Sequence, residues 1–180
     1  MFFFDLLFGK KNQAPPSHDP VAAPVPAAAG KSESAPGTHI HHDPELIVSL
    51  KEDHRRLLTS FRSIAAAAVA GELVAVQNHL GQFQTMIMDH LLKENVRLYV
   101  YLEHLLQNDP VSHEMMHGFR HEMDGIGRVV VGFLTKYKAI ASHPELAAEF
   151  SADLKGIGEA LVARIKREED ILYPMYSAPA

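Results

Sequence analysis

The sequence predicts an all-α protein, an up-down-up-down four-helix bundle with a disordered N-terminal tail and linker. Apolar residues recur three and four positions apart over four long segments, which is the period of an amphipathic helix. Short stretches containing Pro or Gly separate these segments, and short connections make neighbouring helices antiparallel. The chain has 180 residues, which is enough for one domain with a substantial core.

The composition excludes several classes of function. The formal net charge is -5, which argues against nucleic acid as a partner. There is no cysteine, so disulfides, thiolate metal sites and cysteine nucleophiles are excluded together. A metal ion would be held by nitrogen and oxygen atoms, and the twelve histidines make such a site worth testing. We expect no enzymatic activity, because no nucleophile beside a base and no phosphate-binding loop is recognisable.

Residues 1–42 are expected to lie outside the bundle, as an apolar tail followed by a Pro/Ala-rich disordered linker. The opening MFFFDLLFGKKN is far shorter than the roughly 20 residues that span a bilayer. Its lysines follow the apolar run instead of preceding it, unlike a signal peptide, so we expect a cytoplasmic protein. The tail is interpreted as mobile or packed on its own bundle, and the alternative is a weak membrane or protein contact.

Similar motifs mark three of the four helix starts in residues 43–176. HDPEL, NDPVS and SHPEL place Pro44, Pro110 and Pro144 at the first helical position. Gly71 supplies the remaining boundary, and Pro174 ends the last helix. The predicted helices cover approximately residues 44–70, 72–108, 110–141 and 144–173.

Four residues with metal-ligating side chains lie on the apolar faces of three helices. His54 lies within the apolar stripe of the first helix. His90 and Glu94 continue the stripe of the second helix, and Glu168 continues that of the last. Their distances from the helix ends place all four at one level of the bundle. One metal ion would neutralise the carboxylates and accept the imidazole nitrogens. The competing interpretation is a metal-free polar network in which Arg164 pairs with the carboxylates.

The third helix contains HGFRH, in which His117 and His121 have the spacing of a metal-binding pair. The apolar repeat of this helix places both histidines roughly 150° or more from the centre of its buried face. We therefore predict that both face water. Phe119 and Met123 are predicted to take the inward positions instead.

The motifs EDHRRLL, HLLKE and RIKREEDILYP resemble the hemerythrin-like (HHE cation-binding) domain family, whose four-helix bundles hold a non-haem, usually dinuclear, iron site. The resemblance covers about residues 43–176. It implies iron, with Mn or Zn as alternatives, and either oxygen binding or sensing of oxygen, redox state or iron. Dioxygen is then the implied small-molecule partner. The implied metal ligands are His54, His90, Glu94 and Glu168, with Glu169 as the alternative acid.

The sequence departs from this family pattern in two places. Arg164 stands where the family has a histidine in the last helix, and a guanidinium group is not a metal ligand. The third helix supplies no ligand if His117 and His121 face water. We therefore predict one ion per chain instead of the family's usual two, with Arg164 supplying the charge of the second ion.

A second, weaker resemblance provides an alternative function. GIGEALVARIKREEDIL and HLLKENVRLYVYLE are similar to segments of the regulator-of-sigma-D (AlgQ-type) anti-sigma family, whose helical bundles sequester the primary sigma factor. This resemblance implies a metal-independent bundle that binds a transcription protein partner. It covers only these segments, and His54 and Glu94 are not part of its pattern.

Overall fold

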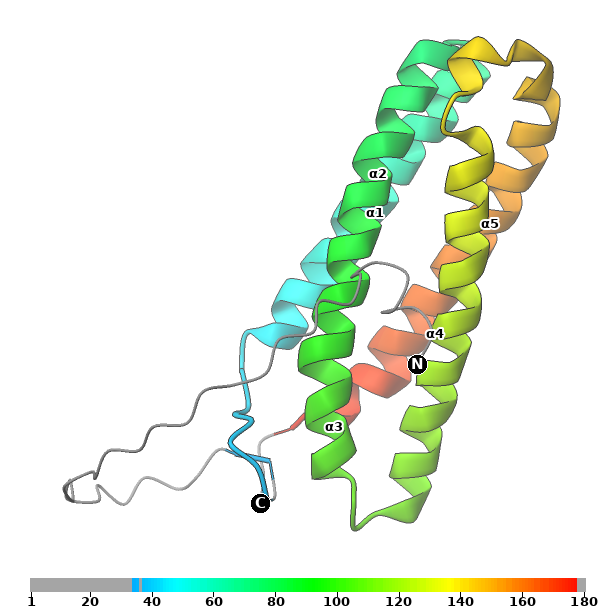
Figure 1. Ribbon diagram of the computed structural model, residues 1–180. Coiled ribbons are helices and arrows are strands. Elements are labelled where there is room, and N and C mark those ends of the chain that lie inside the picture. Colours follow the sequence, from blue (N-terminus) through cyan, green and yellow to red (C-terminus); the bar gives the residue numbers. More distant parts are fainter. Residues whose placement is uncertain (1–33, 36, 178–180) are drawn as a thin grey trace, which may run out of the picture. The chain divides into compact units, whose positions relative to one another are not determined.

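The computed structural model describes residues 34–35 and 37–177, which form four helical rods in an up-down-up-down order (Figure 1). The predicted all-α four-helix bundle is therefore confirmed. The described part of the chain contains no strand beyond one isolated bridge between Ser34 and His41. The Phe-rich tail and most of the expected linker lie outside the described residues.

The elements in chain order are α1 (Leu46–Val69), α2 (Leu73–Lys93), η1 (Glu94–Tyr99), α3 (Val100–Leu105), α4 (Pro110–Tyr137), η2 (Ile140–Ser142), η3 (Pro144–Leu146), α5 (Ala147–Arg167), η4 (Glu168–Leu172) and η5 (Tyr173–Met175). The first and third rods are the single helices α1 and α4. The second rod consists of α2, η1 and α3, and the fourth consists of α5, η4 and η5.

The helix boundaries follow the predicted turn residues at Gly71 and Pro110, with small shifts elsewhere. The helix α1 begins at Leu46, two residues after the predicted start at Pro44, and the last helical segment continues through Pro174 to Met175. Gly71 has a φ of 72°, a left-handed conformation that favours glycine and reverses the chain between α1 and α2. Asp109 caps α4 by accepting a hydrogen bond of 3.2 Å from the backbone N–H of Ser112, and Pro110 is the first helical residue. Pro144 begins the short 3-10 helix η3, so α5 starts three residues later than its motif predicts.

Two π-helical segments, η1 and η4, change which residues face the core beyond them. The hydrogen bonds of a π turn join residues five apart, one more than in an α-helix. The residues after such a turn therefore face a different direction from the one that a regular α-helical period predicts. Leu105 and Met175 continue the three-and-four spacing of the apolar residues that precede η1 and η4, yet both are only half-buried. The neighbouring Leu106 and Tyr176 are buried in their place, one residue later in each rod.

One apolar cluster fills the end of the bundle that contains α3, from the level of η1 and η4 outward. The residues before α1 contribute to it: Ala35 is 1% exposed, and the ring of His42 stacks on Tyr176 at 4.7 Å. The described part of the expected linker therefore packs against the bundle. The buried members of the cluster are Ala35, Leu46, Leu50, Leu98, Tyr99, Tyr101, Leu102, Leu106, Met116, Phe119, Leu172, Tyr173 and Tyr176.

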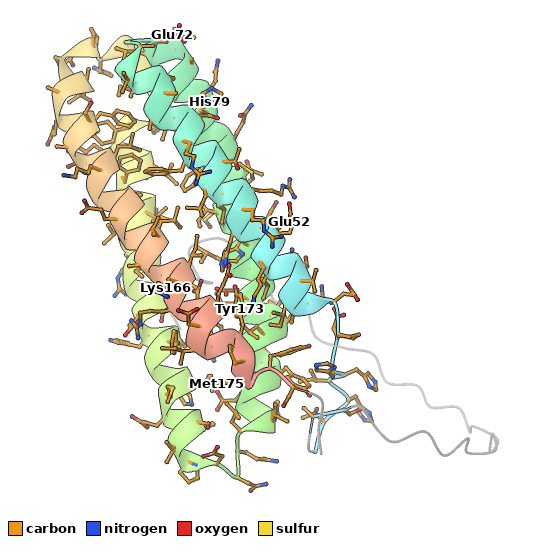
Figure 2. The ribbon with its side chains drawn as sticks, turned by 180° about the vertical axis from the view of Figure 1, so that it is seen from behind. Glu52, Glu72, His79, Lys166, Tyr173 and Met175 are labelled. Carbon is orange, nitrogen blue, oxygen red and sulfur yellow. The ribbon has the colours of Figure 1, made fainter. Side chains whose placement is uncertain are left out.

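The polar faces of the rods are turned outward. Glu52 and Lys166 lie along the exposed faces of α1 and α5 (Figure 2). On α4 both His117 and His121 are exposed, as the apolar period predicted, while Phe119 is buried. None of the helices in the described residues has the length and apolar character needed to cross a bilayer.

Candidate metal centre

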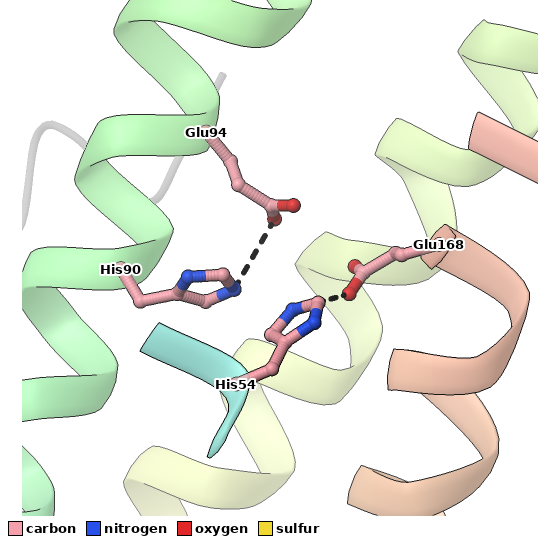
Figure 3. A group of neighbouring side chains, drawn as sticks. All are labelled: His54, His90, Glu94 and Glu168. Atoms are coloured by element: carbon pink, nitrogen blue, oxygen red, sulfur yellow. Dashed lines mark ion pairs between the residues drawn. The ribbon is translucent and has the colours of Figure 1, made fainter. Parts of the chain in front are cut away.

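The four ligand-type residues predicted to face inward meet at one point in the bundle (Figure 3). Each offers one nitrogen or oxygen atom, and these atoms all lie within 4.8 Å of one another. All four side chains are buried, and Glu94 has no exposed surface. The cluster comprises His54 on α1, His90 near the end of α2, Glu94 at the start of η1 and Glu168 at the start of η4.

The local helix geometry brings the side chains together in pairs. His90 and Glu94 are four residues apart on one helix face, and Nε2 of His90 lies 3.9 Å from Oε2 of Glu94. Across the bundle, Nε2 of His54 lies 3.2 Å from Oε2 of Glu168. Each carboxylate begins a π-helical segment. Short π segments occur frequently at functional sites.

A carboxylate also lies behind each imidazole. Nδ1 of His54 is 2.8 Å from Oε1 of Glu169, on the side of the ring away from the cluster. Nδ1 of His90 is 3.8 Å from Oδ2 of Asp53, which in turn accepts a hydrogen bond of 2.5 Å from Lys93. The structure therefore places Glu169, the alternative acid, behind His54 and outside the four-residue cluster. Such carboxylates orient imidazole ligands and increase their basicity.

Two buried tyrosines complete the surroundings, and the sequence reasoning missed both. The hydroxyl of Tyr173 donates to Oε1 of Glu94 at 2.9 Å and lies 3.1 Å from Nε2 of His54. The hydroxyl of Tyr99 accepts a hydrogen bond of 3.0 Å from Arg164. Both tyrosines follow a π-helical turn or lie within one, so a regular α period gives the wrong face for them.

Arg164 brings a positive charge to the edge of the cluster. It is 5% exposed, and its Nε donates a short hydrogen bond to Oε1 of Glu168. A second contact of 3.4 Å joins it to Glu122, and its guanidinium lies 5.1 Å from the centre of the Phe119 ring. Phe119 and the rest of α4 add no ligand atom to the cluster of described residues.

Burial and neighbouring charges set the protonation of the cluster. Burial, together with the charge of His54, lowers the pKa of His90 to about 4, so its imidazole is neutral near pH 7. Burial and the proximity of Glu168 raise the pKa of Glu94 well above its usual value. Burial opposes ionisation of Glu168 too, but the hydrogen bond with His54 and the charge of Arg164 lower its pKa overall.

The donor set suits a cation. Two buried atoms of the cluster, Oε2 of Glu94 and Nδ1 of His90, have no hydrogen-bond partner. An unpaired buried polar atom costs about 1–3 kcal/mol, and a cation next to Oε2 would remove this cost for Glu94. Two imidazoles and two carboxylates are ligands that iron, manganese and zinc accept. The residues present therefore fit a metal ion of this kind.

An apolar cavity of about 380 Å³ adjoins the cluster. His54, His90 and Glu168 of the cluster line it, and Arg164 and Glu122 are the other charged residues of its wall. A small uncharged molecule inside this cavity would therefore lie beside the cluster against mostly apolar side chains. The apolar lining includes Leu57, Phe83, Ile87, Leu91, Met123, Ile126, Val129, Val130, Ile157, Leu161 and Ile165.

Comparison with known protein families matches residues 45–176 to the hemerythrin HHE cation binding domain. The match includes all four residues of the buried cluster. No curated protein and no solved structure matches the chain. Because the matched region covers most of the chain and contains the buried His/Glu cluster, the chain belongs to the hemerythrin HHE cation-binding domain family.

Proposed function

We propose that this protein binds one non-haem iron ion through His54, His90, Glu94 and Glu168, and that it binds dioxygen or senses oxygen, redox state or iron. The observation that carries this proposal is the buried, unpartnered Oε2 of Glu94 within a group of converging nitrogen and oxygen atoms. When bound, iron supplies redox activity and affinity for dioxygen. The imidazoles of His54 and His90 and the carboxylates of Glu94 and Glu168 would hold the ion.

A single ion is favoured by the charges around the centre. Arg164 donates to one oxygen of Glu168, so that oxygen is already engaged. The guanidinium also places a full positive charge where a second cation would be needed, and like charges in a buried site repel strongly. Phe119 and Met123 occupy the inward positions of α4, which leaves the second ion without ligands from that helix.

A binding or sensing role is proposed in preference to catalysis because of the cavity that adjoins the cluster. Its wall is mostly apolar, and its charged members are the cluster residues with Arg164 and Glu122. Such a wall suits a small neutral molecule such as dioxygen and offers few groups to orient a larger polar substrate. A peroxide-turnover assay on the iron-loaded protein tests the enzymatic alternative.

The proposal is tested by loading the purified full chain with ferrous iron without oxygen and measuring bound iron and the absorption change on exposure to oxygen. We expect about one equivalent of iron in the parent chain. His90→Ala should lose this iron. His79→Ala should retain it, because His79 lies on α2 outside the buried cluster. A folded parent chain that binds no iron would favour the metal-free polar network around Arg164. Two equivalents lost together in His90→Ala would show a dinuclear centre.

A further inference from the structure

A second group of ligand-type side chains lies on the surface, where α3 leads into α4. It consists of Glu103 on α3 and of His113 and His117 on α4. Nε2 of His113 is 3.0 Å from Oε1 of Glu103, and Nε2 of His117 is 3.4 Å from the same oxygen. The two imidazole rings have centroids 4.5 Å apart. Three ligand atoms therefore surround one small volume.

The local fold produces this arrangement. His113 and His117 are four residues apart, so they lie one above the other on the same face of α4. The cap at Asp109 fixes where α4 starts, and the connection from α3 to α4 is only a few residues long (Figure 1). The short turn brings Glu103 of α3 opposite the histidine pair.

This group is separate from the buried centre. Glu103 follows Glu94 by nine residues, which is roughly 13 Å along a helix that rises about 1.5 Å per residue. The two groups have no residue in common, and one ion is too small to contact both. The surface group is also more accessible, because the side chains of Glu103, His113 and His117 are 35%, 30% and 44% exposed.

We propose that Glu103, His113 and His117 form a second metal site that binds a divalent cation of the zinc, copper or nickel type. Two imidazole nitrogens and one carboxylate oxygen are ligands these ions prefer, whereas magnesium and calcium favour sites made of oxygen atoms. Three protein ligands leave at least one coordination position to water. Together with the partial exposure of the ligands, this makes the bound ion exchangeable with solution.

An ordinary ion pair accounts for only part of this geometry. One protonated imidazole is enough to pair with Glu103, yet both Nε2 atoms are directed to the same carboxylate oxygen. A divalent cation takes the place of the protons between these atoms and is held by all three groups. Because the ligands come from α3 and α4, the ion also links the two helices at their turn and stabilises the bundle.

The surface site changes how metal content must be interpreted. A chain with one ion in the buried centre and one at the surface contains two metal ions without having a dinuclear centre. Loss of metal on changing His117 would then report the surface site. His121 is exposed on the same helix but does not belong to the group. A substitution of His121 should therefore leave the metal content unchanged if the second ion is bound at the surface site, and lower it if both histidines belong to a dinuclear centre.

The test is equilibrium dialysis of the full chain against zinc chloride, with bound zinc measured for each variant. We expect His113→Ala, His117→Ala and Glu103→Gln each to lower the zinc content by up to one equivalent relative to the parent chain. His121→Ala is the matched control and should bind as much zinc as the parent. His90→Ala should retain the surface equivalent, so failure of the buried centre and failure of the surface site are distinguished.

Zinc should also raise the midpoint of thermal unfolding of the parent and of His121→Ala. This increase should be smaller in His113→Ala and His117→Ala, whose helical circular dichroism confirms that they remain folded. Equal zinc binding by the His113→Ala, His117→Ala double variant and by His121→Ala would overturn the proposal. Retention of zinc in Glu103→Gln alone would overturn the three-ligand assignment.

Discussion

Nδ1 of His54 lies 2.8 Å from Oε1 of Glu169, and this carboxylate holds the imidazole with its Nε2 directed to Glu168. Both acids come from η4 and are adjacent in the sequence, yet they contact opposite nitrogens of one ring. Glu168 belongs to the buried cluster, whereas the side chain of Glu169 is 31% exposed behind it. One ring thus links two neighbouring carboxylates that have different roles.

We predict that Glu169→Gln weakens iron binding by about 10- to 100-fold, because loss of the carboxylate behind a ligating imidazole lowers its basicity and loosens its orientation. At saturating iron the content per chain should stay unchanged. The measurement is competition for iron against a chelator of known affinity. Asp170→Asn is the control, since Asp170 pairs with Lys166 on the outside of the helix. Complete loss of iron in Glu169→Gln at saturation would identify Glu169 as a direct ligand.

We predict that Arg164→Met destabilises the metal-free protein by about 3 kcal/mol, because it leaves Glu168 buried without its cationic partner. Iron should recover part of this loss, since the ion then compensates the carboxylate. The free energy of unfolding is measured by urea titration with and without iron. Arg167→Met is the matched control: Arg167 also contacts Glu122, but its side chain is 49% exposed. Equal effects of the two substitutions would contradict a special role of Arg164.

We predict that Gly125→Leu slows the reaction of the iron-loaded protein with oxygen without changing its iron content. Gly125 lines the cavity, and a Cβ atom added there meets no atom within 4 Å, so there is open space at this position for a side chain to begin and to narrow the cavity. The rate is measured by stopped-flow absorption. Gly132→Leu is the control, since Gly132 is exposed on α4 and lies outside the cavity wall. Both substitutions improve helix propensity by roughly 1 kcal/mol, so stability should change alike.

We predict that a chain beginning at Asp43 is less stable than one beginning at Glu33 by roughly 1–2 kcal/mol. The shorter chain lacks the buried Ala35 and the stacking of His42 on Tyr176. Iron content should be the same in both, because neither contact involves the buried cluster. Urea denaturation of the two chains measures the difference. Identical midpoints and slopes would show that the segment before α1 adds nothing to stability.

The sequence by itself determined the helices and the direction of the four ligand-type residues. The period of apolar residues reports the phase of a helix as long as the helix is regular. His54 and His90 lie within or at the end of regular α-helices, and they face inward as predicted. The same reasoning placed His117 and His121 outside, and both are exposed. These features depend on one helix at a time.

Only the tertiary structure decided what surrounds these residues. The π turns of η1 and η4 rotate the ends of two rods. In the last rod, the turn of η4 buries Tyr173 beside Glu94 and moves Met175 toward the surface. Position along one helix also does not reveal that Glu169 lies behind His54, or that Glu103 faces the histidine pair of α4. These contacts depend on the distance and rotation between helices, which are set by the packing of all side chains together and have no periodic signal in the sequence.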